Sequence, residues 1–174
     1  MSILQRNSAP NRIASTSRTF FVTTKTSMNR SRLQSERNAA LLVDVLRSCI
    51  KARRFRLHDF VIMPDHLHAL LTIDSGESVE RAMQFIKGNF SYRLKKESGY
   101  AGEVWQRGFS EVRIDGKEDF QRYREYIAHN PVKARLASAP ADYPWCFESL
   151  RKIRAAGAKA HSLSEHNGTT VVVP

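Results

Sequence analysis

Two apolar segments, separated only by Pro64 and Asp65, constrain the fold of this chain more than any other feature of its sequence. Residues 57–63 (LHDFVIM) and 66–73 (HLHALLTI) each have the length of a strand and are rich in aliphatic side chains. This pattern predicts a β-hairpin that turns at Pro64 and Asp65. A chain with such a hairpin must build a sheet and cover its apolar surface with other elements.

The second predicted strand carries two histidines, His66 and His68, at alternate positions. Side chains on a strand alternate between faces, so both imidazoles point to one face while Leu67 points to the other. Two residues of a strand span about 6.6 Å, which allows the two rings to converge on one metal ion. Buried and hydrogen-bonded histidines explain most such pairs, so the pair alone leaves both interpretations open.

Residues 117–130 are predicted to form a helix with a defined beginning and end. Asp115 and Glu118 have the spacing of a capping box, which places Asp115 at the N-cap. Pro131 is expected to stop the helix, because the residue before a proline is disfavoured in the α-helical conformation.

This helix carries a tyrosine and an asparagine four residues apart, Tyr126 and Asn130. Positions i and i+4 are neighbours on one helix face, so the phenol and the amide are expected to face the same partner. A tyrosine on an amphipathic helix is usually a core residue. Tyr123, one turn earlier, is a rival to Tyr126 for any chemical role.

The remaining segments complete a β-α-β-β-α-β-α order. Hydrophobic periodicity and capping residues predict a strand at 18–26, a helix from a capping box of Ser31 and Gln34 to about residue 52, a helix at 78–97, and a strand at 103–114 with a break at Gly108. This order indicates an α+β ferredoxin-like sandwich, in which helices cover one face of an antiparallel sheet.

The chain of 174 residues is long enough for one domain with a substantial core, which we expect at residues 18–150. A disordered basic arm at 1–17 and a flexible tail at 151–174 are expected to flank it. The two cysteines form no CxxC pair, which argues against a thiolate zinc site, and nothing in the sequence argues for an oxidising compartment. No apolar run is long enough to span a membrane. We therefore expect a cytoplasmic protein.

Positive charge is concentrated in the first third of the chain. The formal net charge is +11, and residues 1–56 hold 12 of the 28 Lys and Arg residues against only two acidic residues. Residues 57–174 are almost neutral. A surface with ordinary solubilising charge does not require this asymmetry, which favours a polyanionic partner such as nucleic acid.

Four segments of the sequence resemble the REP-associated tyrosine transposases, a branch of the single-tyrosine HUH transposases of bacterial insertion sequences. They occur in the order expected for that family, within residues 18–150: FVIMPDHLHALLTI (60–73), FIKGNFSYRLKK (85–96), VWQRGFSEVRI (104–114) and YIAHNPVKARL (126–136). One departure is YPWCFESL (143–150), where the family often has a Trp-Ser-Ser segment, and it leaves the path of the C-terminal region uncertain.

The resemblance implies an HUH endonuclease fold and assigns roles to specific residues. His66, His68 and Asn130 correspond to the family's ligands for Mg²⁺ or Mn²⁺, and Tyr126 corresponds to its nucleophile. The implied reaction is cleavage of single-stranded DNA through a covalent 5′-phosphotyrosine, which leaves a free 3′-OH. The implied substrate is hairpin DNA with a single-stranded flank, bound by a monomer or a homodimer in the bacterial cytoplasm, close to the nucleoid.

Two other functions remain open from the sequence. A nucleic-acid-binding protein without catalysis would not need the complete set of four residues, and a metal hydrolase that activates water would not need Tyr126. For DNA contacts, we expect the basic and polar residues Arg53, Arg54, Arg56, Lys87, Arg93, Lys95, Lys96, Gln106 and Arg107.

Overall fold

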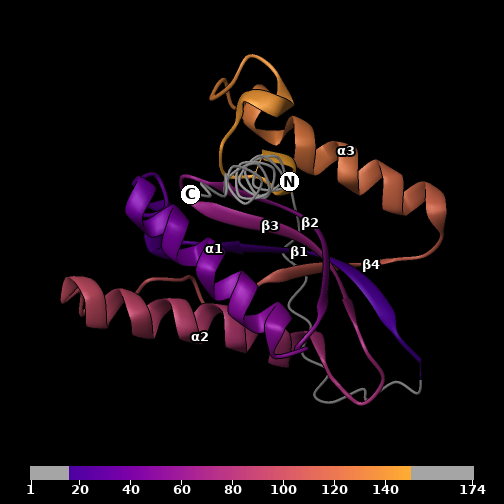
Figure 1. The fold of residues 1–174 in the computed structure, drawn as a ribbon, viewed down its shortest axis with the longest axis horizontal. Helices are drawn as coiled ribbons and strands as arrows, with labels where there is room; N and C mark the ends of the chain where they lie inside the picture. Colours follow the sequence, from indigo (N-terminus) through magenta and orange to yellow (C-terminus); the bar gives the residue numbers. More distant parts are fainter. Residues whose placement is uncertain (1–15, 150–174) are drawn as a thin grey trace, which may run out of the picture.

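The computed structural model describes residues 16–149, which form a four-stranded sheet and three helices (Figure 1). Along the chain the elements are β1 (Arg18–Lys25), α1 (Glu36–Lys51), β2 (Arg56–Met63), β3 (His66–Ile73), α2 (Val79–Ser98), β4 (Ser110–Ile114) and α3 (Lys117–Lys133). Two short 3₁₀ turns, η1 (Ser27–Asn29) and η2 (Pro140–Asp142), complete the set.

The sheet has the strand order β2-β3-β1-β4, and every neighbouring pair is antiparallel. This is the order of a ferredoxin-like β-α-β-β-α-β unit, so the predicted α+β class and antiparallel sheet are confirmed. The hairpin at Pro64 and Asp65 forms as expected and joins β2 to β3. β1 and β3 lie in the centre of the sheet, and their register pairs Thr23 with His68.

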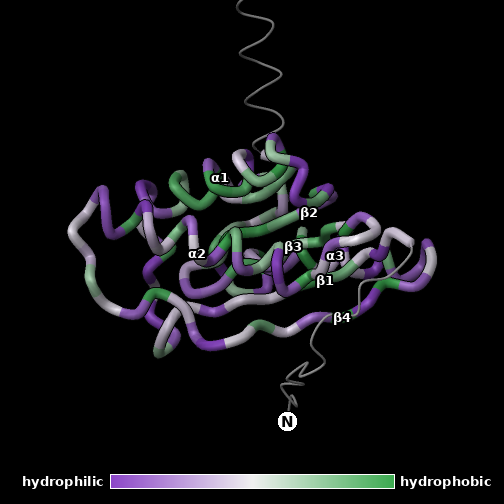
Figure 2. Tube along the Cα trace, turned by 90° about the horizontal axis from the view of Figure 1, so that it is seen from below, coloured by the Kyte–Doolittle hydropathy of each residue, from purple (hydrophilic) through white to green (hydrophobic). Residues whose placement is uncertain are grey.

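The expectation that all helices cover one face of the sheet is wrong. α1 and α2 pack on one face, whereas α3 packs on the opposite face (Figure 1). The central strands supply apolar side chains to both faces: Val22 and Leu67 face α1 and α2, and Phe21 and Leu70 face α3. Near-continuous apolar strands are typical of sheets that are covered on both faces, and Figure 2 shows this hydrophobic concentration along β2 and β3.

The first helix begins later than the capping pattern predicts. Ser35, rather than Ser31, is the N-cap of α1, and its hydroxyl accepts a hydrogen bond from the backbone N–H of Asn38. The N–H of Leu33 donates to the carbonyl of Pro64 at 2.8 Å. This bond ties the segment before α1 to the β2–β3 turn, so the helix starts only after it.

α3 begins at Lys117 as predicted, but its N-cap residue and its C-terminal end differ from the prediction. Gly116 is the N-cap residue, with no side-chain cap, and the helix continues through Pro131 to Lys133. Proline removes one backbone donor, but here it lies in the last turn, where only one hydrogen bond is lost. The Pro131 ring is buried, and the helix closes with a bond from the Ala134 N–H to the Asn130 carbonyl.

The last strand is shorter than the predicted 103–114, because only Ser110–Ile114 pairs with β1. Residues 103–109 form an irregular connection, in which Trp105 makes an isolated bridge to Thr26 and Gly108 adopts a positive φ of 72°. The strand therefore begins only after the break expected at Gly108 and does not continue across it.

A segment after α3 covers the outer edge of β2. The Tyr143 hydroxyl donates to the Ile62 carbonyl at 2.8 Å, and the Ile62 N–H donates to the Trp145 carbonyl at 2.9 Å. These contacts satisfy edge groups that would otherwise be open for pairing. The proposed tail at 151–174 and residues 1–15 of the proposed arm lie outside the described residues. Within residues 16–149, no helix is both long and apolar enough to cross a lipid bilayer.

Candidate active site

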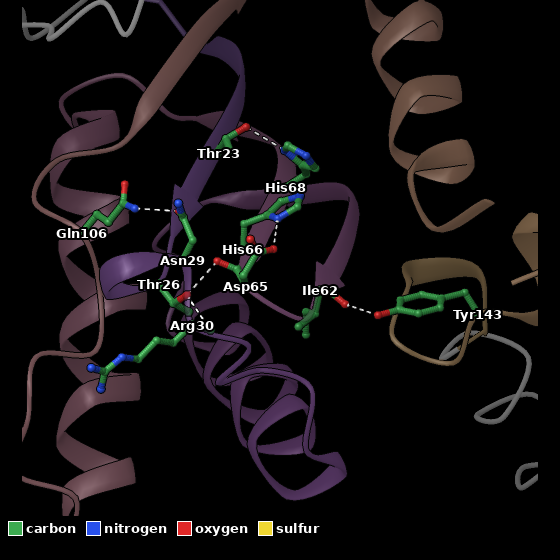
Figure 3. A network of polar contacts seen from close by, with 10 residues as sticks. All are labelled: Thr23, Thr26, Asn29, Arg30, Ile62, Asp65, His66, His68, Gln106 and Tyr143. Atoms are coloured by element: carbon green, nitrogen blue, oxygen red, sulfur yellow. Dashed lines mark hydrogen bonds and ion pairs between the residues drawn. The ribbon is translucent and has the colours of Figure 1, made fainter. Parts of the chain in front are cut away.

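His66 and His68 lie side by side on β3, on the face of the sheet that α3 covers (Figure 3). Their ring centroids are 4.6 Å apart, and the ring planes are inclined by 74°. The neighbouring residue Asp65 accepts a hydrogen bond from Nδ1 of His66 at 2.6 Å. Across the sheet, the Thr23 hydroxyl hydrogen-bonds with Nδ1 of His68 at 2.7 Å. In both histidines, the hydrogen bond that orients the ring is therefore made by Nδ1.

These bonds leave the Nε2 atoms of both rings available. Within residues 16–149, neither Nε2 has a hydrogen-bond partner. Metal-binding histidines commonly hold the second ring nitrogen in such a bond, which fixes the tautomer. His68 is only 6% exposed. Burial, followed by the charges of His66 and Lys25, lowers the pKa of His68 from 6.5 to about 3, so this imidazole is neutral at physiological pH and able to coordinate a cation.

Tyr126 reaches the histidine pair from α3. Its ring centroid is 5.4 Å from that of His68, with an angle of 72° between the planes. Phe21 on β1 supports both rings: it stacks on His68 at 5.2 Å and meets the edge of Tyr126 at 5.7 Å. Tyr126 remains 39% exposed. The phenol is thus fixed beside His68 and is still accessible to a large substrate.

Tyr123 occupies a different environment from Tyr126. It stacks on Phe21 at 4.6 Å between ring centroids and packs against the core cluster between α3 and the sheet. Within the described chain it makes no ring contact with either histidine, whereas Tyr126 does. The geometry therefore favours Tyr126 over Tyr123 as the chemically active phenol.

Asn130 follows Tyr126 by one helical turn and is partly buried. Its amide has no hydrogen-bond partner within residues 16–149, so its oxygen is available to a ligand. The same part of the chain contains no group of three or more His, Cys, Asp or Glu that could hold a metal. A metal at this site would depend on two imidazoles and the Asn130 amide, and the free Nε2 atoms and free amide fit such a role.

The family described as "Transposase IS200 like" matches residues 18–130, which include all four strands and both Tyr126 and Asn130. This chain belongs to the IS200-like transposase family. It is therefore a DNA-processing enzyme of the transposase type, which confirms the resemblance seen in the sequence.

Individual relatives agree with this assignment. The REP-associated tyrosine transposase of Escherichia coli (strain K12) is 26% identical over 133 residues, which cover 73% of this chain and 74% of the relative. A REP-associated tyrosine transposase solved with a REP hairpin has a TM-score of 0.69 at 22% identity, over 86% of this chain and 87% of the other. A transposase candidate from Deinococcus radiodurans R1 has a TM-score of 0.50 at 18% identity, over 68% of this chain and 95% of the other. These two structures establish the likeness of fold.

The three arginines after α1 lie on the edge of the molecule near the start of β2. Arg54 stacks over Phe85 of α2 at 4.1 Å, and Arg56 pairs with Asp74 at 3.1 Å. Arg53 adopts a left-handed conformation with φ of 53° at the helix end. Arg54 contacts the helix on the other side of the sheet, and Arg56 pairs with Thr72 at the end of β3 that lies away from His66, so the structure does not bring these two residues to the histidine pair.

The candidates on α2 divide into exposed and engaged residues. The ammonium of Lys87 donates to the carbonyls of Gln106 at 2.8 Å and Gly108 at 2.6 Å, and burial lowers its pKa. Lys87 therefore holds the connection before β4 in place. Arg93 pairs with Glu97, and the two remaining candidates, Lys95 and Lys96, are exposed.

Gln106 and Arg107 lie in the connection before β4, beside the end of β1. The Gln106 N–H donates to the carbonyl of Lys25, and Lys25 pairs with His66 in the sheet. The Gln106 side chain donates to Asn29 at 2.8 Å (Figure 3), and Arg107 is exposed. These two candidates therefore lie at the same end of the sheet as His66.

Sequence reasoning missed the residues that orient the two imidazoles. Asp65 was assigned only to the turn, although its position directly before His66 in PDHLH was a usable signal. Thr23 has no such signal, because its contact with His68 depends on the β1–β3 register.

Proposed function

We propose that this transposase cuts and rejoins single-stranded DNA through a covalent bond to Tyr126. The contact between Tyr126 and His68, at 5.4 Å between ring centroids, is the observation that carries the proposal. A metal site alone suits many hydrolases. An accessible phenol held against the same histidines suits nucleophilic attack.

His66, His68 and Asn130 would hold the metal ion. When bound, a divalent cation supplies Lewis acidity that polarises the phosphate to be cleaved. Imidazole ligands also suit zinc, whereas the amide oxygen and the family resemblance favour Mg²⁺ or Mn²⁺. Asp65 and Thr23 prepare the site, because each fixes one imidazole before any substrate arrives.

The chemistry at Tyr126 exchanges one phosphate ester for another. Its phenol oxygen bonds to the phosphorus while the bond from phosphorus to the 3′ oxygen breaks. The phenol proton is lost to solvent, and the departing 3′ oxygen takes up a proton to become the 3′-OH. The product is a 5′-phosphotyrosine, whose ester energy allows a 3′-OH to reverse the step and join strands. The reaction consumes no nucleotide cofactor.

We propose hairpin DNA with a single-stranded flank as the substrate. The solved relative with the same fold is bound to a REP hairpin, and the net charge of +11 favours a phosphate backbone. We retain the exposed cations Arg53, Arg107, Lys95 and Lys96 as proposed phosphate contacts. Arg54, Arg56 and Arg93 would first have to leave the partners that they have in the free protein.

The test is a denaturing gel of the protein incubated with labelled hairpin DNA and Mn²⁺. The wild type should form a slowly migrating covalent species, and excess chelator should suppress it. Tyr126→Phe should abolish the species while DNA binding persists, because the change removes one hydroxyl and little volume. Tyr123→Phe is the matched control and should retain activity.

The other outcomes identify the alternatives. Cleaved DNA without an adduct would indicate a hydrolase that activates water. Binding without cleavage would indicate a nucleic-acid-binding protein. An adduct that survives Tyr126→Phe but disappears with Tyr123→Phe would transfer the nucleophilic role to Tyr123.

A further inference from the structure

The exposed side of α3 has a pocket of about 370 Å³ directly beside Tyr126. Its lining residues all come from α3: Arg122, Glu125, Tyr126, His129, Val132 and Lys133. The pocket lies on the side of the tyrosine that the sheet does not cover. A strand of DNA that brings a phosphate to the phenol has to pass this surface.

Lys133 is the cation of this pocket that is placed against the nucleophile. It follows Tyr126 by two helical turns, and its Nζ lies 5.3 Å from the centroid of the Tyr126 ring. The side chain is exposed, and within residues 16–149 it forms no ion pair with a carboxylate. Its positive charge is therefore not neutralised by the protein.

Arg122 offers a close comparison on the same helix. It lies one turn before Tyr126, but its guanidinium is 5.3 Å from the Tyr123 ring and pairs with Asp119 at 2.8 Å. The two cations thus line one pocket, yet each stacks on a different tyrosine. Only Lys133 lies over the phenol that contacts His68.

The other polar groups of the pocket are engaged within the helix. Glu125 accepts a hydrogen bond from Gln121 at 2.9 Å, and Nδ1 of His129 hydrogen-bonds with the Glu125 carbonyl at 3.0 Å. A cation in the last turn of a helix is favourable on its own account. That explanation does not require the ammonium to lie over Tyr126, so the position calls for a further cause.

We propose that Lys133 is a catalytic residue that binds a non-bridging oxygen of the phosphate attacked by Tyr126. In the free protein the ammonium rests on the electron-rich ring face, and in the complex it moves to the phosphate. It thereby holds the phosphate next to the phenol and offsets the negative charge that builds up there. This inference rests on the proposed phosphotyrosine reaction.

The two possible roles of Lys133 predict rate effects of different size. Holding the ring through an exposed cation–π contact is worth only a factor of about 2 to 5. Removing a group that stabilises charge in the transition state costs a factor of roughly 100 to 1,000. The loss caused by Lys133→Gln therefore separates them.

The experiment measures the first-order rate of adduct formation at saturating hairpin DNA, and DNA affinity by fluorescence anisotropy. We expect Lys133→Gln to lower the rate about 100-fold and to weaken binding less than about 3-fold. Lys133→Arg should restore most of the rate, because it keeps the charge. Arg122→Gln, the matched control, should stay within about 3-fold of the wild type. Both residues are exposed, so thermal unfolding should confirm an intact fold.

Three results would overturn the inference. A rate loss below 5-fold for Lys133→Gln would mean that Lys133 only contacts the Tyr126 ring. An equal loss for Arg122→Gln would mean that both cations only attract DNA through their charge. A loss confined to binding would make Lys133 part of a DNA track. The proposed function fails separately, when the wild type forms no adduct or Tyr126→Phe still forms one. The assignment of Lys133 would then fall with it.

Discussion

Replacing Thr23 with valine removes a single hydroxyl from the site and almost preserves the shape of the side chain. That hydroxyl is 2.7 Å from Nδ1 of His68, and the two residues are direct cross-strand partners. We expect the loss to appear both as weaker metal binding and as lower stability.

The size of each effect follows from the contacts. Removing a group that orients a metal-binding histidine typically costs about 10- to 100-fold in metal affinity. The ring of His68 is only 6% exposed, so water replaces the hydroxyl poorly. A buried polar atom left without a partner costs about 1–3 kcal/mol. For a chain of this size, that corresponds to a fall in Tm of roughly 3–10 °C.

The chain contains a matched control at the next position. Thr24 is only 1% exposed, points to the opposite face of β1, and has a hydroxyl without a partner among residues 16–149. Thr24→Val makes the same chemical change but removes an unsatisfied polar atom. It should therefore leave Mn²⁺ binding unchanged and stabilise the protein by up to about 1–2 kcal/mol.

The assay combines isothermal titration with Mn²⁺ and urea unfolding of both variants in the presence of chelator. Thr23→Val should bind Mn²⁺ more weakly and unfold at lower urea concentration than the wild type, while Thr24→Val should do neither. If the two variants behave alike in both measurements, the bond from Thr23 does not orient His68, and the account of the site given above is wrong.

Two further predictions concern His68 and Lys87. Burial lowers the pKa of His68 from 6.5 to about 3. Between these two pH values, the imidazole is protonated in the unfolded chain and neutral in the folded chain. The chelated protein should therefore lose up to about 1.4 kcal/mol of stability per pH unit as the pH falls below about 6.5, and His68→Gln should flatten the urea-unfolding profile between pH 6.5 and 5. Lys87→Met leaves the carbonyls of Gln106 and Gly108 without their donor and should cost about 1–3 kcal/mol. Unchanged stability, together with a salt slope of DNA binding reduced by about 0.7, would instead make Lys87 a phosphate contact.

The elements that the sequence predicted well are those defined by their own side chains. The predicted strand at 66–73 coincides with β3, because its apolar composition and the flanking turn are local signals. The hydrophobic periodicity that predicts a helix at 78–97 is also a local signal, and the apolar residues of α2 at that spacing are buried: Val79, Met83, Ile86, Phe90 and Leu94. The helical spacing of Tyr126 and Asn130 also needed nothing beyond the helix itself.

The errors arose where a distant contact overrides a local preference. Serine is a favoured N-cap residue, so Ser31 was a reasonable candidate. The hydrogen bond from the Leu33 N–H to the Pro64 carbonyl holds the segment after Ser31 against the β2–β3 turn, and Ser35 is the N-cap instead. Proline usually ends a helix, so Pro131 predicted an end at Asn130. In the structure the helix continues, because burial of the Pro131 ring compensates for the one hydrogen bond that proline removes from the final turn. Neither the contact of Leu33 with Pro64 nor the buried environment of Pro131 can be identified without knowing how the sheet packs.

The side of the sheet on which α3 packs could have been deduced from the proposed chemistry. His66 and His68 share the face opposite Leu67, and Leu67 belongs to the core with α1 and α2. A nucleophile on a helix of the Leu67 face would be separated from the imidazoles by the sheet. Placing all helices on one face was therefore incompatible with a joint role for Tyr126 and the two histidines.

The packing of α3 also decides where a complete site can form. Phe21 contacts His68, Tyr123 and Tyr126, so one β1 side chain links α3 to β3. α3 buries Ile127 in a cluster with Phe21, and Tyr143 closes this cluster at the β2 edge. His66, His68 and Tyr126 are thus brought together within one chain. Because Tyr126 contacts His68 of its own chain, we expect the proposed reaction to use the tyrosine and the histidines of one subunit.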